Sequence, residues 1–364
     1  MINSKKWCCV TLSAVFILTV LLGSLTAVID PFFHYHAPLE GLSYPISEQR
    51  YQNHGILKHF PYNAVITGTS MTENFKTSEL DALFGVTSVK VPFSGATFKE
   101  IDDNLKHAFR SNGDITLVVR SLDGYMLFSD KDEMRQDAEY PEYLYDGNLL
   151  NDVSYWFNVE ILLNHTMKVL QYTFAGQPTT SFDDYSSWGE RFAFGPEALL
   201  KRHSLPASIP DPIPMDEATE SMIRENVLQN VISTACENPD VQFYYYFPPY
   251  SILWWCNQKN QGNLNRQMDA YRLATEAILQ CENIRLFSFV GETEITTDLN
   301  HYMDPEHHSA QINSRILRDM HAGRNLLTQE NQEAYWNAQE RFYDTFDYAG
   351  HFAAYGHPAI NEAS

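Results

Sequence analysis

The feature that most constrains the fold of this chain is an uncharged apolar run from Trp7 to Ile29. Its 23 residues are rich in Leu, Val and Ile. As a helix rising about 1.5 Å per residue, the run would span roughly 30 Å of hydrocarbon. Lys5 and Lys6 precede it and Asp30 follows it, which predicts a cytoplasmic N-terminus and a main domain outside the membrane. We therefore predict a short cytoplasmic tail (1–6) and a single-pass transmembrane anchor (7–29).

The alternative interpretation of this run is a cleaved signal peptide. The run is longer than the usual apolar core of a signal peptide. Cleavage after Ala27 would also leave Leu25 where a small residue is preferred, and both points favour the anchor. No later segment reaches 18 uncharged apolar residues, so we expect the chain to cross the membrane once.

Composition excludes some classes of protein and leaves others open. The net charge is −21, and such a surface repels nucleic acid, so we expect no nucleic-acid partner. The chain has five cysteines. Two of them, Cys8 and Cys9, lie at the start of the apolar run. The other three, Cys236, Cys256 and Cys281, form no C-x-x-C pair, which disfavours a structural zinc site. One disulfide or three buried thiols are both compatible with this spacing.

Beyond the apolar run, strand and helix signals alternate. An irregular, aromatic-rich connection (30–60) leads into a domain (61–325) that contains an insertion at about 125–215, with some helix near 155–172. A C-terminal helix and tail (326–364) follow. Short apolar runs separated by helical stretches predict an α/β, three-layer sandwich with a mostly parallel five-stranded sheet, similar to flavodoxin. The predicted strands are Ala64–Thr67, Val86–Val91, Ile115–Val119, Val241–Phe247 and Ile284–Val290.

Polar residues follow several of these strands. In doubly wound sheets, ligands bind beyond the carboxyl ends of the strands, so these residues should converge. Ser70 follows the first strand, Gly95 the second and Asp123 the third, while Asp298 and His301 follow the fifth. A hydrolytic serine needs a base and a carboxylate that orients the base. We therefore predict Ser70 as nucleophile, His301 as general base and Asp298 as its orienting carboxylate. Ser70 could instead simply cap the helix that follows it.

Three blocks together resemble the SGNH/GDSL hydrolase superfamily. Gly68-Thr69-Ser70 is similar to the nucleophile block, Gly95 to the oxyanion glycine, and Asp298-Leu299-Asn300-His301 to the acid–base block. The resemblance covers roughly residues 60–325 without the insertion. The superfamily's Gly-x-Asn-Asp block is replaced here by Ser121-Leu122-Asp123-Gly124. The third oxyanion donor is then missing or supplied elsewhere, and Asn74 is our candidate for it.

The anchored topology looks like the DltD-type and polysaccharide O-acetylation-type members of bacteria. This resemblance implies a serine esterase or acyltransferase that acts outside the membrane on an envelope polysaccharide or teichoic acid, without a cofactor. It also allows for a membrane acyltransferase as partner. The alternative is a catalytically inactive SGNH-like module that binds glycans or acts as a scaffold for such a partner. His307 and His308 are adjacent and would point about 100° apart in a helix, so we expect no metal site there.

Overall fold

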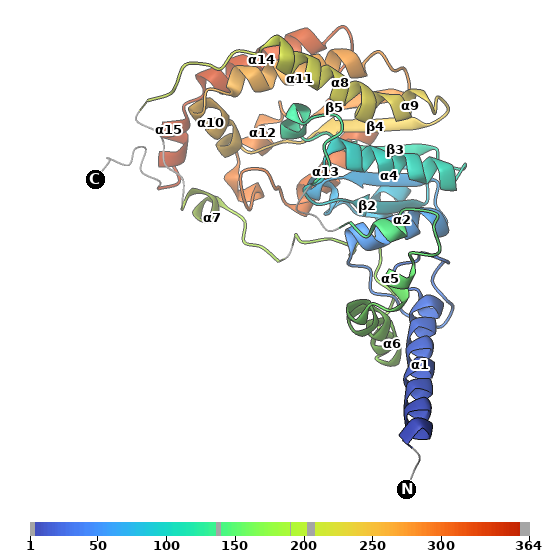
Figure 1. Cartoon of the computed structure of the whole chain (residues 1–364). Coiled ribbons are helices and arrows are strands. Elements are labelled where there is room, and N and C mark those ends of the chain that lie inside the picture. Colours follow the sequence, from blue (N-terminus) through green and yellow to red (C-terminus); the bar gives the residue numbers. More distant parts are fainter. Residues whose placement is uncertain (1–3, 136–139, 190, 202–207, 357–364) are drawn as a thin grey trace. The chain divides into compact units, whose positions relative to one another are not determined.

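The computed structural model of this chain describes residues 4–135, 140–189, 191–201 and 208–356 (Figure 1). The chain forms two compact units. Unit 1 comprises Met1–Pro61 and Asp137–Tyr185, and unit 2 comprises Tyr62–Gln136 and Ser186–Ser364. The expected insertion is therefore divided between the units. Residues 1–3 of the predicted tail and 357–364 of the predicted C-terminal segment lie outside the described residues.

Unit 2 is built on one parallel sheet of five strands in the order β2-β1-β3-β4-β5. The α/β class and the five-stranded parallel sheet predicted from the sequence are confirmed. This order is that of flavodoxin-like doubly wound sheets, in which the connections reverse direction beside the first strand. The strands are β1 (Ala64–Gly68), β2 (Ser88–Pro92), β3 (Leu117–Ser121), β4 (Gln242–Phe247) and β5 (Ile284–Ser288).

The strands are buried on both sides because helices cover both faces of the sheet. Every residue of β1, β2 and β3 is buried, as expected for parallel strands without a solvent-facing side. Helices α3 (Thr77–Phe84) and α13 (Ala310–His321) pack against each other. A second group contains α4 (Phe98–Ser111), α8 (Glu217–Val227) and α11 (Leu264–Ile278). In Figure 1, α8, α11 and α14 (Gln332–Thr345) lie together along one side of the sheet.

Short elements connect these helices and strands. Thr97 and Glu100 form the capping box that opens α4, as their T-x-x-E spacing predicts. The remaining elements of unit 2 are η1 (Ser70–Thr72), η2 (Gly124–Phe128), α7 (Pro196–Leu200), η5 (Leu228–Ile232), α9 (Ser233–Cys236), α10 (Ile252–Asn260), α12 (Thr293–Thr296), η6 (Leu299–His301) and α15 (Tyr348–Ala353).

Unit 1 begins with α1 (Ser4–Ile29), which is long and apolar enough to cross a membrane. No other helix among the described residues meets that criterion. The unit also contains α2 (Gln49–His59), which lies inside the connection predicted to be irregular. Its other elements are η3 (Glu142–Leu144), α5 (Val153–Trp156), the π-helical η4 (Ile161–Thr166) and α6 (Met167–Phe174).

Asp30 organises the chain where α1 ends. Its carboxylate accepts hydrogen bonds from the backbone N–H groups of His34, Tyr35 and His36. It also accepts one from the hydroxyl of Tyr155 at 2.7 Å. Next to it, Phe32 and Tyr155 belong to a small apolar core. The aromatic connection after α1 is therefore folded against residues from the expected insertion, although more than 100 residues separate them in sequence.

A disulfide joins Cys236 to Cys281, with the two Cα atoms 6.0 Å apart. It links the end of α9 to the segment just before β5. Of the two interpretations left open by the sequence, the disulfide applies to this pair, and Cys256 is a buried free thiol.

This disulfide should contribute measurably to stability. The bond spans a sequence separation of 45 residues, for which loop-closure entropy gives up to about 4 kcal/mol. Reduction of the detergent-solubilised chain should lower the urea midpoint of unfolding. The double variant Cys236→Ser/Cys281→Ser should start from the lower midpoint and be insensitive to reductant. An equal response of variant and wild type to reductant would contradict the assignment.

Candidate active site

The candidate nucleophile lies on a tight turn at the carboxyl end of β1. Gly68 has φ of +145°, a conformation that side chains other than glycine rarely adopt. A Cβ at this position would also collide with the Ser121 hydroxyl and lie 2.7 Å from the Thr72 methyl carbon. Ser70 then opens the short helix η1, and its side chain remains partly exposed. Gly68 thus allows the strand to turn sharply and present Ser70 at the sheet edge.

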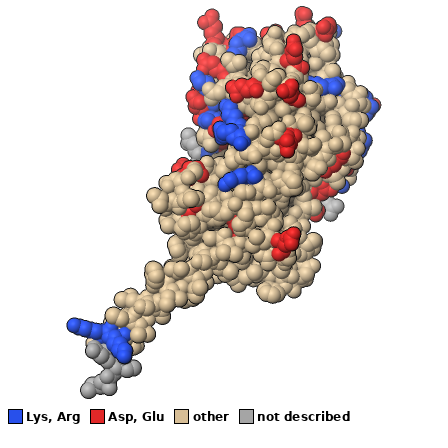
Figure 2. Space-filling model, turned by 90° about the vertical axis from the view of Figure 1, so that its right-hand side faces the viewer, with Lys and Arg blue, Asp and Glu red and all other residues tan. Residues whose placement is uncertain are grey.

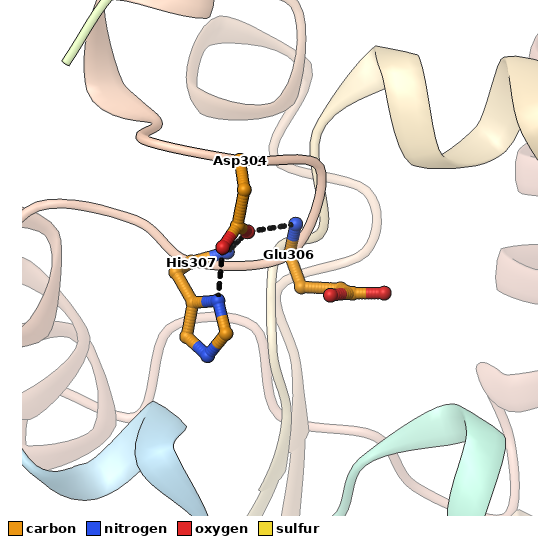
Figure 3. A group of neighbouring side chains, drawn as sticks. All are labelled: Asp304, Glu306 and His307. Atoms are coloured by element: carbon orange, nitrogen blue, oxygen red, sulfur yellow. Dashed lines mark hydrogen bonds and ion pairs between the residues drawn. The ribbon is translucent and has the colours of Figure 1, made fainter. Parts of the chain in front are cut away.

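Ser70 is bonded to a histidine, which is in turn bonded to a carboxylate. Ser70 Oγ lies 2.7 Å from Nε2 of His307, and Nδ1 of His307 lies 2.7 Å from Oδ2 of Asp304. The other carboxylate oxygen of Asp304 accepts the backbone N–H groups of Glu306 and His307. Figure 3 shows this turn, with the imidazole held against Asp304. The arrangement is the serine–base–carboxylate relay of acyl-transfer enzymes.

The hydrogen bonds determine which imidazole nitrogen carries the proton. A carboxylate only accepts, so the Nδ1 of His307 must donate to Asp304, and Nε2 of the neutral ring is left to accept from Ser70. Burial by itself would lower the pKa of His307. The hydrogen bond and charge of Asp304, with smaller contributions from Glu306 and Asp123, outweigh burial and raise it. His307 is thereby a stronger base than an isolated histidine.

The structure assigns the imidazole partner of Ser70 differently from the sequence prediction. The sequence contains Asp-x-x-His twice, at Asp298–His301 and at Asp304–His307, and it is the second copy that reaches Ser70. Asp298 instead caps η6 by accepting the N–H of Asn300. His301 has an exposed fraction of 36% and only a 3.5 Å contact with Asp298. The local sequence does not show which of the two copies contacts Ser70. The path of the loop before α13 decides it, because this loop brings His307 to Ser70.

Three hydrogen-bond donors suited to an oxyanion are available near Ser70 in sequence or at the same sheet edge. The backbone N–H groups of Ser70 and Gly95 donate no hydrogen bond within the described part of the chain. Gly95 lies just after β2, whose Pro92 is in register with Gly68. Asn74 is buried, and its Nδ2 has no partner among the described residues. A buried donor without an acceptor is costly.

The orientation of the Asn74 amide follows from its neighbours. Its Oδ1 accepts the backbone N–H groups of Trp188 and Gly189, both at 3.0 Å. Because both partners donate, the atom that faces them must be the oxygen, which leaves the amide nitrogen on the other side. Asn74 was the sequence candidate for the third oxyanion donor; its Nδ2 is buried and has no partner among the described residues, and its role as a donor stays a prediction.

Arg135 was not singled out in the sequence. Its guanidinium donates to the Ser94 carbonyl at 2.7 Å and occupies the space that a Cβ at Gly95 would need. Gly95 also has φ of +62°, a conformation that favours glycine. Arg135 places a positive charge beside the Gly95 turn. No local signal marked this arginine, which lies in a segment without helical or strand periodicity.

Asp123 stabilises the turn Gly68-Thr69-Ser70, here called the nucleophile turn. Its buried carboxylate accepts the hydroxyl groups of Thr69, Ser121 and Tyr250, at 2.9, 3.0 and 2.9 Å. Burial raises the pKa of Asp123, and these three hydrogen bonds oppose that rise. Thr69 immediately precedes Ser70, so Asp123 acts on the nucleophile through the turn rather than by direct contact.

Asp304, Glu306 and His307 also have the composition of a metal site, since their ligand atoms lie within 4.8 Å of one another. Both ring nitrogens of His307 are already engaged, by Ser70 and by Asp304. In Figure 3 the carboxylate of Glu306 extends away from the imidazole. A metal ion would have to break the relay to gain a nitrogen ligand, so the geometry favours proton transfer over metal binding.

A cavity of about 270 Å³ lies next to Tyr125 and Trp254. Trp254 hydrogen-bonds Glu306, whose pKa is raised by burial. Ser70, His307 and Asp304 do not themselves line the cavity. Its remaining lining consists of Phe128, Arg266 and four carboxamide side chains, Gln258, Gln261, Asn263 and Gln267.

Comparison of the chain with protein-family models, with curated proteins and with solved structures finds no match.

The pH dependence of any Ser70 chemistry should report on His307. The base works only when it is neutral, so activity should fall as the pH drops through the raised pKa of His307, above its ordinary value of 6.5. Asp304→Asn removes the main influence that raises this pKa. In the pH–rate profile of this variant, the fall in rate at acidic pH should therefore occur at lower pH, and the plateau rate should be lower than in the wild type. Rates of ester hydrolysis against pH would test this.

The matched control is Asp298→Asn in the first Asp-x-x-His copy. It should leave both the acidic limb and the plateau of the pH–rate profile unchanged. A profile that responds to Asp298→Asn and not to Asp304→Asn would contradict the assignment of the relay.

Proposed function

We propose that this protein is a membrane-anchored serine esterase or acyltransferase of the SGNH type that acts outside the cytoplasm on cell-envelope polysaccharide or teichoic acid. The observation that carries the proposal is the continuous chain of hydrogen bonds from Ser70 through His307 to Asp304. A serine that only capped a helix would not need an imidazole at 2.7 Å with a carboxylate behind it.

In this proposal Ser70 Oγ attacks the acyl carbonyl carbon while its proton passes to Nε2 of His307. The tetrahedral intermediate carries its charge on the former carbonyl oxygen, facing the N–H groups of Ser70 and Gly95 and the amide of Asn74. Collapse breaks the bond to the alcohol, which leaves with the proton from His307. Water or a second hydroxyl then attacks the acyl-serine, with His307 again acting as base. Attack by water gives hydrolysis, and attack by a second hydroxyl gives acyl transfer.

Charge favours a neutral glycan over teichoic acid as the polymer. The chain has a net charge of −21, and Asp123, Asp304 and Glu306 add buried or half-buried acids around the site. An anionic polyphosphate would be repelled. The cavity next to Tyr125 and Trp254 offers carboxamides and aromatic rings, which suit sugar hydroxyls and the apolar faces of sugar rings. Its volume of about 270 Å³ is small, as for one sugar unit.

Two observations support the location. Helix α1 has the length and composition of a membrane span, with lysines on its N-terminal side only. The Cys236–Cys281 disulfide suits an oxidising compartment outside the cytoplasm.

A fluorophosphonate probe distinguishes a nucleophilic serine from a capping one. It should label the wild-type chain at Ser70, and Ser70→Ala should abolish labelling. His307→Ala should slow labelling by roughly 10²–10⁴-fold, because the general base is lost. His301→Ala, in the exposed copy of the motif, is the matched control and should label at the wild-type rate. Labelling is followed by gel fluorescence and by mass spectrometry of the modified peptide.

The opposite order, with His301→Ala inert and His307→Ala active, would refute the relay. A folded wild-type chain that never labels would instead favour the inactive glycan-binding or scaffold alternative, which the missing Gly-x-Asn-Asp block also suggests.

The cavity makes a separate prediction about substrate preference. Gln258→Ala and Gln261→Ala should each raise KM for an O-acetylated oligosaccharide by about 2- to 12-fold, the equivalent of 0.5–1.5 kcal/mol for one hydrogen bond. Hydrolysis of p-nitrophenyl acetate, which is too small to reach these side chains, should not change. Gln280→Ala, on the surface outside the cavity, is the control. Equal effects on both substrates would argue against a sugar subsite.

A further inference from the structure

We propose that residues 149–174, here called the apolar arm, lie in the outer leaflet of the membrane beside α1. The arm contains α5, η4 and α6 of unit 1. This inference rests on the proposed membrane anchor and is independent of the proposed catalysis.

The arm exposes more apolar surface than a water-facing segment should. Leu150 and Phe174 are 85% and 86% exposed, close to the maximum for a folded residue. Further exposed apolar side chains are Leu149, Val153, Phe157, Val159 and Leu163. The segment carries three charged residues: Asp152 is buried, Lys168 is half-buried and Glu160 is exposed.

Contacts within unit 1 fix the level of the arm along α1. The Phe157 ring lies against Gly23, where an added Cβ would come within 2.5 Å of it. The hydroxyl of Thr166 donates to that of Thr26 at 3.3 Å. Gly23, Thr26 and Ile29 are the buried residues of α1. The arm therefore packs along the last two turns of the helix, rather than beyond its end.

This level determines what surrounds the arm. Gly23 lies six residues before Ile29, which is about 9 Å along a helix axis. If Trp7–Ile29 spans the bilayer, Phe157 lies at a depth where interfacial amphipathic helices bury their apolar faces, about 5–10 Å. In Figure 2 the narrow α1 region shows blue only next to the grey N-terminal residues and is otherwise free of charged colours. Acyl chains thus suit both α1 and the arm.

Spin-label accessibility in nanodiscs tests the placement with the full chain. Labels are introduced in a Cys8→Ser/Cys9→Ser background. Cys256 can remain, because it is buried and burial raises the pKa of its thiol to about 12. Leu150→Cys and Phe174→Cys report on the arm. Leu18→Cys reports on the middle of α1 and Glu220→Cys on the water-exposed surface of α8.

Labels at Leu150, Phe174 and Leu18 should be relaxed more strongly by oxygen than by a water-soluble nickel chelate, and the label at Glu220 should behave in the opposite way. If the arm labels respond like the label at Glu220 while the label at Leu18 is relaxed more strongly by oxygen, the placement of the arm in lipid is wrong and the membrane anchor is supported. If the label at Leu18 is also relaxed more strongly by the nickel chelate, the membrane anchor itself is contradicted. Arm labels shielded from both reagents would show that a protein surface, such as a second copy of the chain, covers the arm, and this too would overturn the placement in lipid.

Discussion

The site depends on the parallel pairing of β1 with β2 on one side and β3 on the other. Parallel strands end at the same edge, so the segments after them are brought together whatever their separation in sequence. The register Gly68↔Pro92 aligns the nucleophile turn with the turn that carries Gly95. β3 brings Ser121 and Asp123 to the same edge. A shift of this register would separate the proposed oxyanion donors from Ser70.

Buried hydrogen bonds then fix the relative positions of the segments that meet at this sheet edge. Asp123 joins the end of β3, the segment after β4 and the nucleophile turn through three hydroxyl groups. Asn74 is oriented by the backbone at Trp188 and Gly189, and Asp304 orients His307. Each of these groups would be costly if left unsatisfied in the interior. These hydrogen bonds hold the candidate site in a fixed geometry, as the proposed catalysis requires.

The strands were predictable because each is a short buried run bounded by turn residues, a signal that needs no long-range information. Ser70, Gly95 and Asn74 became candidates because they lie after those strands or on the turn that carries Ser70. The choice between His301 and His307 did not, because both belong to an Asp-x-x-His pattern and local sequence weighs them equally. Their difference lies in tertiary structure: one copy caps a short helix at the surface, and the other folds back over Ser70. Arg135 and the contact of Phe157 with Gly23 likewise join segments that no local periodicity connects.

The central claim is that Ser70, activated by His307, faces a preformed oxyanion site. A crystal structure of the protein after reaction with a fluorophosphonate tests it most directly. The account predicts phosphorus bonded to Ser70 Oγ and a phosphoryl oxygen about 3 Å from the N–H groups of Ser70 and Gly95 and from Nδ2 of Asn74. The ring beside the adduct should be that of His307. A phosphoryl oxygen turned to solvent, or an adduct flanked by His301, would contradict it.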